Sequence, residues 1–140
     1  MTATDHHAAA AHIQALLANH GYNVAETQPA HFTIRETHSG VSLQAVLQGD
    51  VLYLSLVCTV VPPAAITSEM MWNMLAADNG ISTSYFQLYR AGAGEVAVAL
   101  NNFCKLEDLG PDDEDEILSC IHFLLADVIS ARRLLSGLSN

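Results

Sequence analysis

Residues 41–60, VSLQAVLQGDVLYLSLVCTV, hold the pattern that decides the fold. Apolar residues alternate with polar ones up to Gly49 and Asp50, and a second alternating run follows to Val60. Period-two alternation is typical of strands, and a short turn between two such runs predicts an antiparallel hairpin. The second run has two apolar faces, which predicts a central strand. One face is expected to carry Leu52, Leu54, Leu56, Cys58 and Val60, and the other Val51, Tyr53 and Val57.

Outward from this hairpin, the remaining patterns predict a single α+β domain over residues 1–140. A first helix is expected at about residues 5–19, and a strand from His31 pairs with the hairpin. A second helix over residues 67–78 precedes a second hairpin, with strands at 82–90 and 95–101, and a long helix follows Gly110 and Pro111. The expected order αβββαββα gives two layers, a five-stranded antiparallel sheet with helices packed on it.

Composition and charge exclude several classes of protein. Apolar residues make up 51% of the chain and charged residues 14%, which predicts a folded chain. Fifteen acids against five bases give a formal charge of -10, which disfavours nucleic acid and anionic membranes as partners. No apolar stretch is long enough to insert into a membrane, and the N-terminus lacks the pattern of a secretory signal. We therefore expect an acidic, cytoplasmic protein.

The candidate metal ligands and nucleophiles do not form a pattern that predicts chemistry. His6, His7 and His12 lie in one helix without a carboxylate or thiol at ligand spacing, so we expect them to be exposed and to bind no metal. The three cysteines are widely spaced among apolar neighbours, which is typical of reduced thiols in a core. They are Cys58, Cys104 and Cys120.

Enzymatic motifs are also missing from the sequence. The glycines at 92 and 94 lie between two predicted strands, where a hairpin turn explains them better than a nucleotide-binding loop. No serine has the setting of a nucleophile elbow. We therefore expect no cofactor and no catalysis.

The predicted helix 67–78 has two apolar faces. At 100° per residue Met71, Trp72 and Leu75 share one face, while Met70 and Met74 lie about 120° away. A helix buried on most sides explains this pattern, and so does a helix with one face against another chain. The sequence leaves both interpretations open.

A second candidate surface is the face of the sheet that points away from the helices. The alternation places apolar and tyrosine side chains there, which is typical of a surface that binds a partner peptide, although ordinary exposed tyrosines are the alternative. The candidate partner-binding residues are Val46, Tyr53, Val57, Tyr85 and Tyr89.

Acidic residues are concentrated between Glu107 and Glu116, around the predicted start of the last helix. Negative charge at a helix N-terminus is stabilised by the macrodipole and the exposed N–H groups. Capping and solvation explain the run, with a docking patch for a basic partner as the alternative.

The order of elements, the acidic charge and residues 70–102, MMWNMLAADNGISTSYFQLYRAGAGEVAVALNN, resemble the type III secretion chaperone-like superfamily. This superfamily includes the class I, Tir-chaperone-like effector chaperones and the YbjN-type sensory-regulator proteins. The resemblance is carried mainly by Leu75, Asn79, Gly80, Phe86, Leu88, Val96, Val98 and Leu100.

The resemblance implies a homodimer that binds extended segments of another protein, such as a secreted effector, without chemistry. It implies that the second helix lies at the dimer interface, with Met70, Trp72 and Met74 as candidate contacts. A YbjN-like sensory or stress regulator is the alternative, and an enzyme with an unrecognised site is a third.

Overall fold

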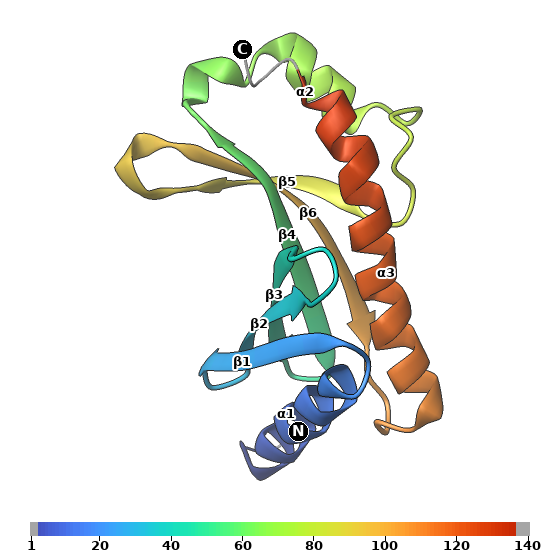
Figure 1. The fold of residues 1–140 in the computed structure, drawn as a ribbon. Coiled ribbons are helices and arrows are strands. Elements are labelled where there is room, and N and C mark those ends of the chain that lie inside the picture. The colour runs from blue at the N-terminus through green and yellow to red at the C-terminus, as the bar shows by residue number, and fades with distance from the viewer. Residues whose placement is uncertain (1–2, 137–140) are drawn as a thin grey trace. The chain divides into compact units, whose positions relative to one another are not determined.

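The computed structural model of the chain describes the backbone of residues 3–136 and the side chains of residues 7–136. Within this range the fold is α+β, with three α-helices and six strands (Figure 1). The helices are α1 (Ala3–Ala18), α2 (Ser68–Leu75) and α3 (Pro111–Leu134). The strands are β1 (Tyr22–Gln28), β2 (His31–Glu36), β3 (Ser42–Gln48), β4 (Val51–Val61), β5 (Tyr85–Arg90) and β6 (Val96–Lys105).

The strands lie in the sheet order β1-β2-β3-β4-β6-β5. The hairpin predicted at residues 41–60 is confirmed, because β3 and β4 pair antiparallel with Ala45 opposite Leu54. The second hairpin is also confirmed, since β5 and β6 pair antiparallel. Its turn is a short 3-10 segment in which Ala93 and Gly94 have positive φ, as expected for a turn rather than a nucleotide-binding loop.

The prediction of five strands was wrong by one, because β1 was missed. β1 pairs antiparallel with β2, with Val24 opposite Ile34. Its sequence, YNVAETQ, has only two large apolar residues and its second half is exposed, so it lacks the alternation that marks a half-buried strand. Pro29 and Ala30 form the turn to β2, and Ala30 adopts a positive φ.

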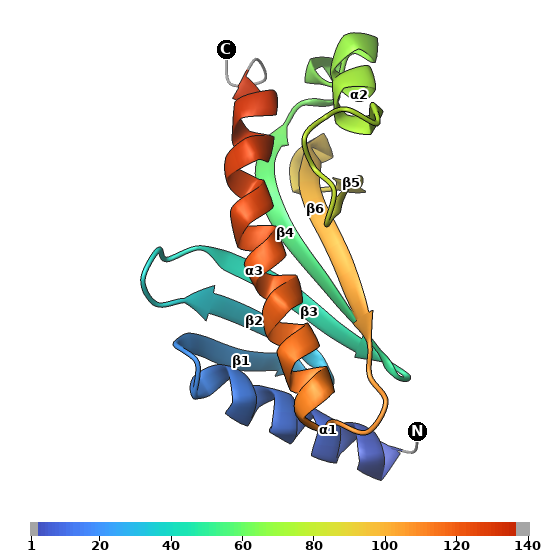
Figure 2. The same cartoon turned by 90° about the vertical axis from the view of Figure 1, so that its right-hand side faces the viewer.

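The chain divides into two compact units. Unit 1 consists of Met1–Ser55 and Phe103–His122, and unit 2 of Leu56–Asn102 and Phe123–Asn140. In unit 1 helix α1 lies beside β1 (Figure 2). Most buried side chains of unit 1 come from one face of α1, one face of each of β2, β3 and β4, and the first half of α3. They include Ile13, Leu17, Phe32, Ile34, Leu43, Leu52, Leu54, Ile117 and Ile121.

The core of unit 2 is smaller and joins α2 to the strands and the end of α3. Its buried members are Val61, Met74, Val98 and Leu135, with Met70 and Phe86 packed against them. Val61 is buried while Val60 is exposed, so the expected inward position of Val60 is corrected. The strict alternation of β4 fails near its end, because Cys58 and Val61, three residues apart, face the same core.

Helix α2 ends three residues earlier than predicted. Ala76 has extended backbone angles, and the Asn79 side chain donates to the Met74 carbonyl at 2.6 Å. The same side chain accepts a hydrogen bond from the Ile81 amide at 2.9 Å. Asn79 therefore satisfies a carbonyl that the helix end leaves unpaired, and the helix ends before residue 78, the predicted last residue. Among the described residues, no helix combines the length and apolar character needed to cross a bilayer.

Candidate functional site

The first candidate surface is the face of the unit 1 strands that points away from their buried side chains. We call this surface the open face of unit 1. The strand register places His31, Val46 and Tyr53 side by side on this face. The Tyr53 ring lies 6.2 Å from the ring of Phe103 on β6. Tyr53 and Phe103 are 43% and 56% exposed. The structure therefore brings the predicted residues Val46 and Tyr53 together and adds Phe103, which the sequence analysis missed.

The second candidate surface is the corresponding face of unit 2. Val57, Tyr85 and Tyr89 are all exposed there, as predicted. Tyr85 lies opposite Asn101 and Tyr89 opposite Ala97 in the β5–β6 register. The buried Asn101 amide donates to the Tyr89 hydroxyl and to Gln87 Oε1, and that hydroxyl in turn donates to Gln87 Oε1 at 2.9 Å. This hydrogen-bond network orients Tyr89 on the surface.

The third candidate surface is the outer side of α2. Trp72 is 74% exposed and Leu75 76% exposed, and Met71 lies beside them. Together with residues 76–78 they line a shallow hollow of about 650 Å³. Trp72 therefore leaves a large apolar surface of this short helix exposed to water.

The two apolar faces predicted for this helix are present, and the core takes the face that carries Met70 and Met74. Met74 is only 4% exposed, and Met70 packs against the same core. Met74 is therefore not on the surface to meet a second chain, which corrects its place among the candidate dimer contacts. Of the three candidates only Trp72 projects into solvent, with Met71 and Leu75 as its neighbours.

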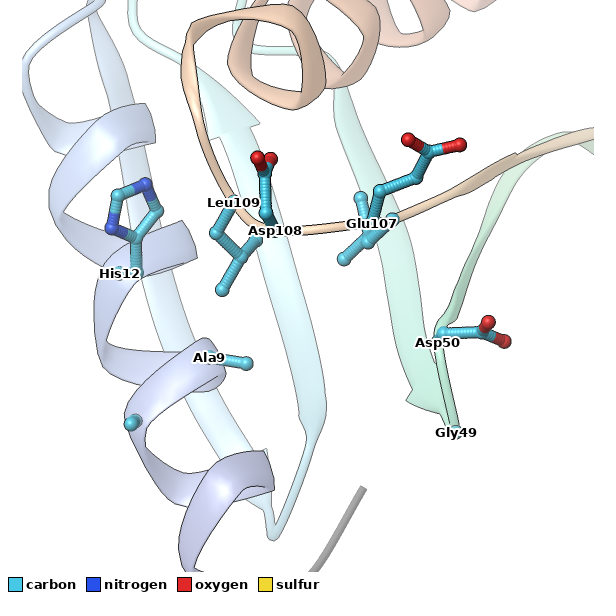
Figure 3. A pocket seen from close by; sticks show the side chains of 9 residues that line it. Ala9, His12, Gly49, Asp50, Glu107, Asp108 and Leu109 are labelled. Atoms are coloured by element: carbon cyan, nitrogen blue, oxygen red, sulfur yellow. The ribbon is translucent and has the colours of Figure 1, made fainter.

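A polar pocket of about 820 Å³ lies in unit 1 between α1, the β3–β4 turn and the segment that follows β6 (Figure 3). Ala9 and Leu109 contribute apolar walls, and Asp50, Glu107 and Asp108 contribute carboxylates. Figure 3 shows the Asp50 and Glu107 carboxylates turned away from α1. One oxygen of the Asp108 carboxylate has a partner within the protein, because Oδ1 accepts a hydrogen bond from the Gly110 amide at 2.9 Å.

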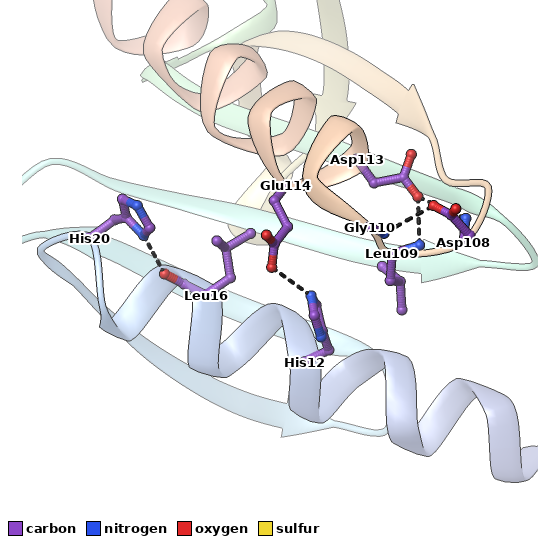
Figure 4. A network of polar contacts seen from close by, with 8 residues as sticks. All are labelled: His12, Leu16, His20, Asp108, Leu109, Gly110, Asp113 and Glu114. Atoms are coloured by element: carbon purple, nitrogen blue, oxygen red, sulfur yellow. Dashed lines mark hydrogen bonds and ion pairs between the residues drawn. The ribbon is translucent and has the colours of Figure 1, made fainter.

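His12 makes a long-range contact that the sequence analysis did not anticipate. Its Nε2 lies 2.9 Å from Glu114 Oε2, across 102 residues of sequence, and both side chains are partly exposed (Figure 4). The expectation of an exposed histidine is thus corrected for His12 and holds for His7. The side chain of His6 lies outside the described residues. Ion pairs with this much exposure contribute at most about 1 kcal/mol to stability.

Asp113 organises the acidic segment before α3. Its carboxylate is buried, and Oδ2 accepts from the Glu107 amide at 2.8 Å. The same oxygen accepts from the amides of Asp108 and Leu109 at 3.0 and 2.8 Å (Figure 4). Leu109 has φ +56°, a conformation that a leucine rarely adopts without such support. Asp113 therefore binds the amides of the loop that leads into α3, not the N–H groups of the first helical turn that the capping interpretation concerned, and Asp112, Asp115 and Glu116 are exposed.

The cysteines lie in the interior, as expected. Cys104 and Cys120 are buried in unit 1 and Cys58 is partly buried in unit 2. Burial raises the pKa of Cys58 to about 11, against the opposing effect of Arg132. The hydrogen bond that the Cys104 thiol donates to Cys120, together with burial, raises the pKa of Cys104, and the same hydrogen bond lowers the pKa of Cys120. Cys58 and Cys104 are therefore protonated thiols near neutral pH, not activated nucleophiles.

Among residues 7–136 no three His, Cys, Asp or Glu side chains are grouped to hold a metal ion.

Comparisons with known proteins identify the fold. No protein-family model and no curated protein sequence matches the chain. A crystal structure of an uncharacterized protein from Methanothermobacter thermautotrophicus matches with a TM-score of 0.60 and 14% identity, over 91% of this chain and 94% of that one. A chain of the heterodimeric ExoU–SpcU complex from the type III secretion system of Pseudomonas aeruginosa matches with a TM-score of 0.57 and 17% identity, over 89% and 96%. The chain therefore shares its fold with these two solved structures.

Proposed function

We propose that this protein is a non-enzymatic, homodimeric binding module that holds an extended segment of a partner protein, as a type III secretion chaperone does. The observation that carries the proposal is the set of aromatic side chains left exposed on the open faces of the two units, on this fold. A chain of matching fold is solved in a complex with a protein partner, ExoU–SpcU. Aromatic side chains with a polar tip are enriched at protein interfaces and carry much of the binding energy there.

Replacing Tyr53 and Tyr85 with alanine should weaken partner capture while leaving the fold intact. Both side chains are more than 40% exposed, so their truncation removes little from either core. Truncating an aromatic anchor costs about 1 to 3 kcal/mol of binding free energy. Tagged wild-type and variant proteins are purified from the native cells, and the captured proteins are identified by mass. Capture of the same partners at unchanged yield, with an unchanged melting temperature, would place binding elsewhere.

We propose that the outer side of α2 forms the homodimer interface, with Trp72 at its centre and Met71 and Leu75 beside it. Trp72→Glu should then give a folded monomer, because a charge introduced at a packed interface is desolvated without a partner. Light scattering measures the mass and circular dichroism the fold. Matched Ile129→Glu, at an exposed position of α3, should remain dimeric. A folded dimer of the Trp72 variant would contradict the assignment.

A YbjN-like regulator is the second candidate function. This candidate rests on the sequence resemblance alone, because the matching Methanothermobacter thermautotrophicus protein is uncharacterized. The capture experiment separates the two functions. A secreted client supports the chaperone, and a resident regulatory protein supports the regulator.

A further inference from the structure

The open face of unit 1 has a charge pattern opposite to that of the whole chain. The chain carries fifteen acids and five bases. The unit 1 parts of the strands contain two acids, Glu26 and Glu36, and both face the core side, opposite Phe32 and Tyr22 in the register. No carboxylate therefore stands on the open face of these described strand segments. Two of the five bases, Arg35 and Lys105, do stand there, and the remaining side chains on it are neutral or histidine.

Both cations are available to a partner. Arg35 is exposed, and none of the described carboxylates pairs with its guanidinium, which lies over Gly40. Lys105 Nζ lies 3.9 Å from the Asp50 carboxylate in the β3–β4 turn, but its side chain is 69% exposed. A contact that long and that exposed to water holds the lysine weakly.

The two cations flank the aromatic row. Along β2, Arg35 lies four residues from His31, which begins the row His31–Val46–Tyr53. Lys105 follows Phe103 by two residues on the same side of β6, beyond the other end of the row. Strand spacings of about 4.8 Å and a rise of about 3.3 Å per residue put the two charges roughly 25 Å apart, the reach of about seven extended residues.

We propose that the open face of unit 1 binds an extended acidic segment of a partner protein. An apolar side chain of that segment contacts the Tyr53–Phe103 pair, and its carboxylates lie near Arg35 and Lys105. The inference rests on the proposed function and names the chemistry of the partner. A second copy of the chain does not fit, because its identical face would bring cations to cations without a carboxylate. Complementary charge of this kind sets specificity and association rate, and the neutral aromatic centre supplies affinity.

The test uses two labelled eleven-residue peptides and the full chain. Both peptides have the same centre, Thr-Leu-Thr-Phe-Thr-Leu-Thr. One peptide has two glutamates at each end, and the other has two lysines at each end. We expect the glutamate peptide to bind at least about tenfold more tightly in fluorescence anisotropy at low salt, although the protein carries a charge of -10. High salt should reduce the preference.

Variants assign the preference to the named side chains. Arg35→Gln with Lys105→Gln should lower it to about threefold or less, and Arg35→Lys with Lys105→Arg should keep it. The matched control Arg132→Gln with Arg133→Gln removes the same charge from exposed positions of α3 and should leave the preference unchanged. Tyr53→Ala with Phe103→Ala should weaken both peptides by about tenfold. Circular dichroism checks that each variant is folded.

Equal or tighter binding of the lysine peptide overturns the inference, and so does the absence of binding by either peptide. The proposed function is still supported if partner capture from cells depends on Tyr53 and Tyr85. If capture does not depend on these two residues, the capture experiment contradicts the proposed function itself.

Discussion

Replacing Met74 with glutamate is expected to unfold the chain, whereas the same replacement at the adjacent Leu75 leaves it folded. Met74 is 4% exposed and packs with Val61, Val98 and Leu135, while Leu75 is 76% exposed. A carboxylate at position 74 loses the packing of the methionine and is removed from water among apolar side chains. The combined penalty is about 4 kcal/mol or more, a large share of the 5 to 15 kcal/mol that holds a typical domain together.

Urea denaturation followed by circular dichroism measures this difference. Met74→Glu should show little or no folded baseline at 25 °C, and Leu75→Glu should differ from the wild type by at most about 0.5 kcal/mol in a monomeric sample. A folded, monomeric Met74→Glu chain would mean that the methionine meets a second chain after all. Met74→Leu serves as the volume-conserving control and should cost less than about 1.5 kcal/mol.

The α2 helix shows where sequence reasoning reached its limit. The spacing of its methionines, tryptophan and leucine was enough to predict two apolar faces. It was not enough to predict which face the core takes, since both have similar hydrophobicity and the choice depends on where Val98 and Leu135 lie in three dimensions. Helical periodicity fixes which residues share a face, and only tertiary contacts fix the direction of that face.

The strands were predicted best where one of their faces is buried and least where both are exposed. β3 and the first half of β4 alternate cleanly because Leu43, Leu52 and Leu54 are fully covered. β1 forms an edge of the sheet, has a mostly exposed face and therefore gave no pattern. The ring contact of Phe103 with Tyr53 and the pairing of His12 with Glu114 are contacts between distant parts of the sequence, for which a single sequence carries no local signal.

Replacing Asp113 with alanine is expected to destabilise the chain by about 2 to 4 kcal/mol, because it leaves three backbone N–H groups without their acceptor. It also removes the support that holds Leu109 at φ +56°.

All three donors meet the same oxygen, Oδ2, so Asp113→Asn keeps an acceptor in place while removing the charge. That variant should lose about 1 kcal/mol, less than the alanine variant, because neutral hydrogen bonds are weaker than those to a carboxylate. Asp112→Ala, at an exposed position one residue earlier, should change stability by no more than about 0.5 kcal/mol. Urea denaturation of the three variants gives the ranking. An alanine variant as stable as the wild type would show that water replaces the Asp113 carboxylate at no loss, and that the acidic segment has its shape without it.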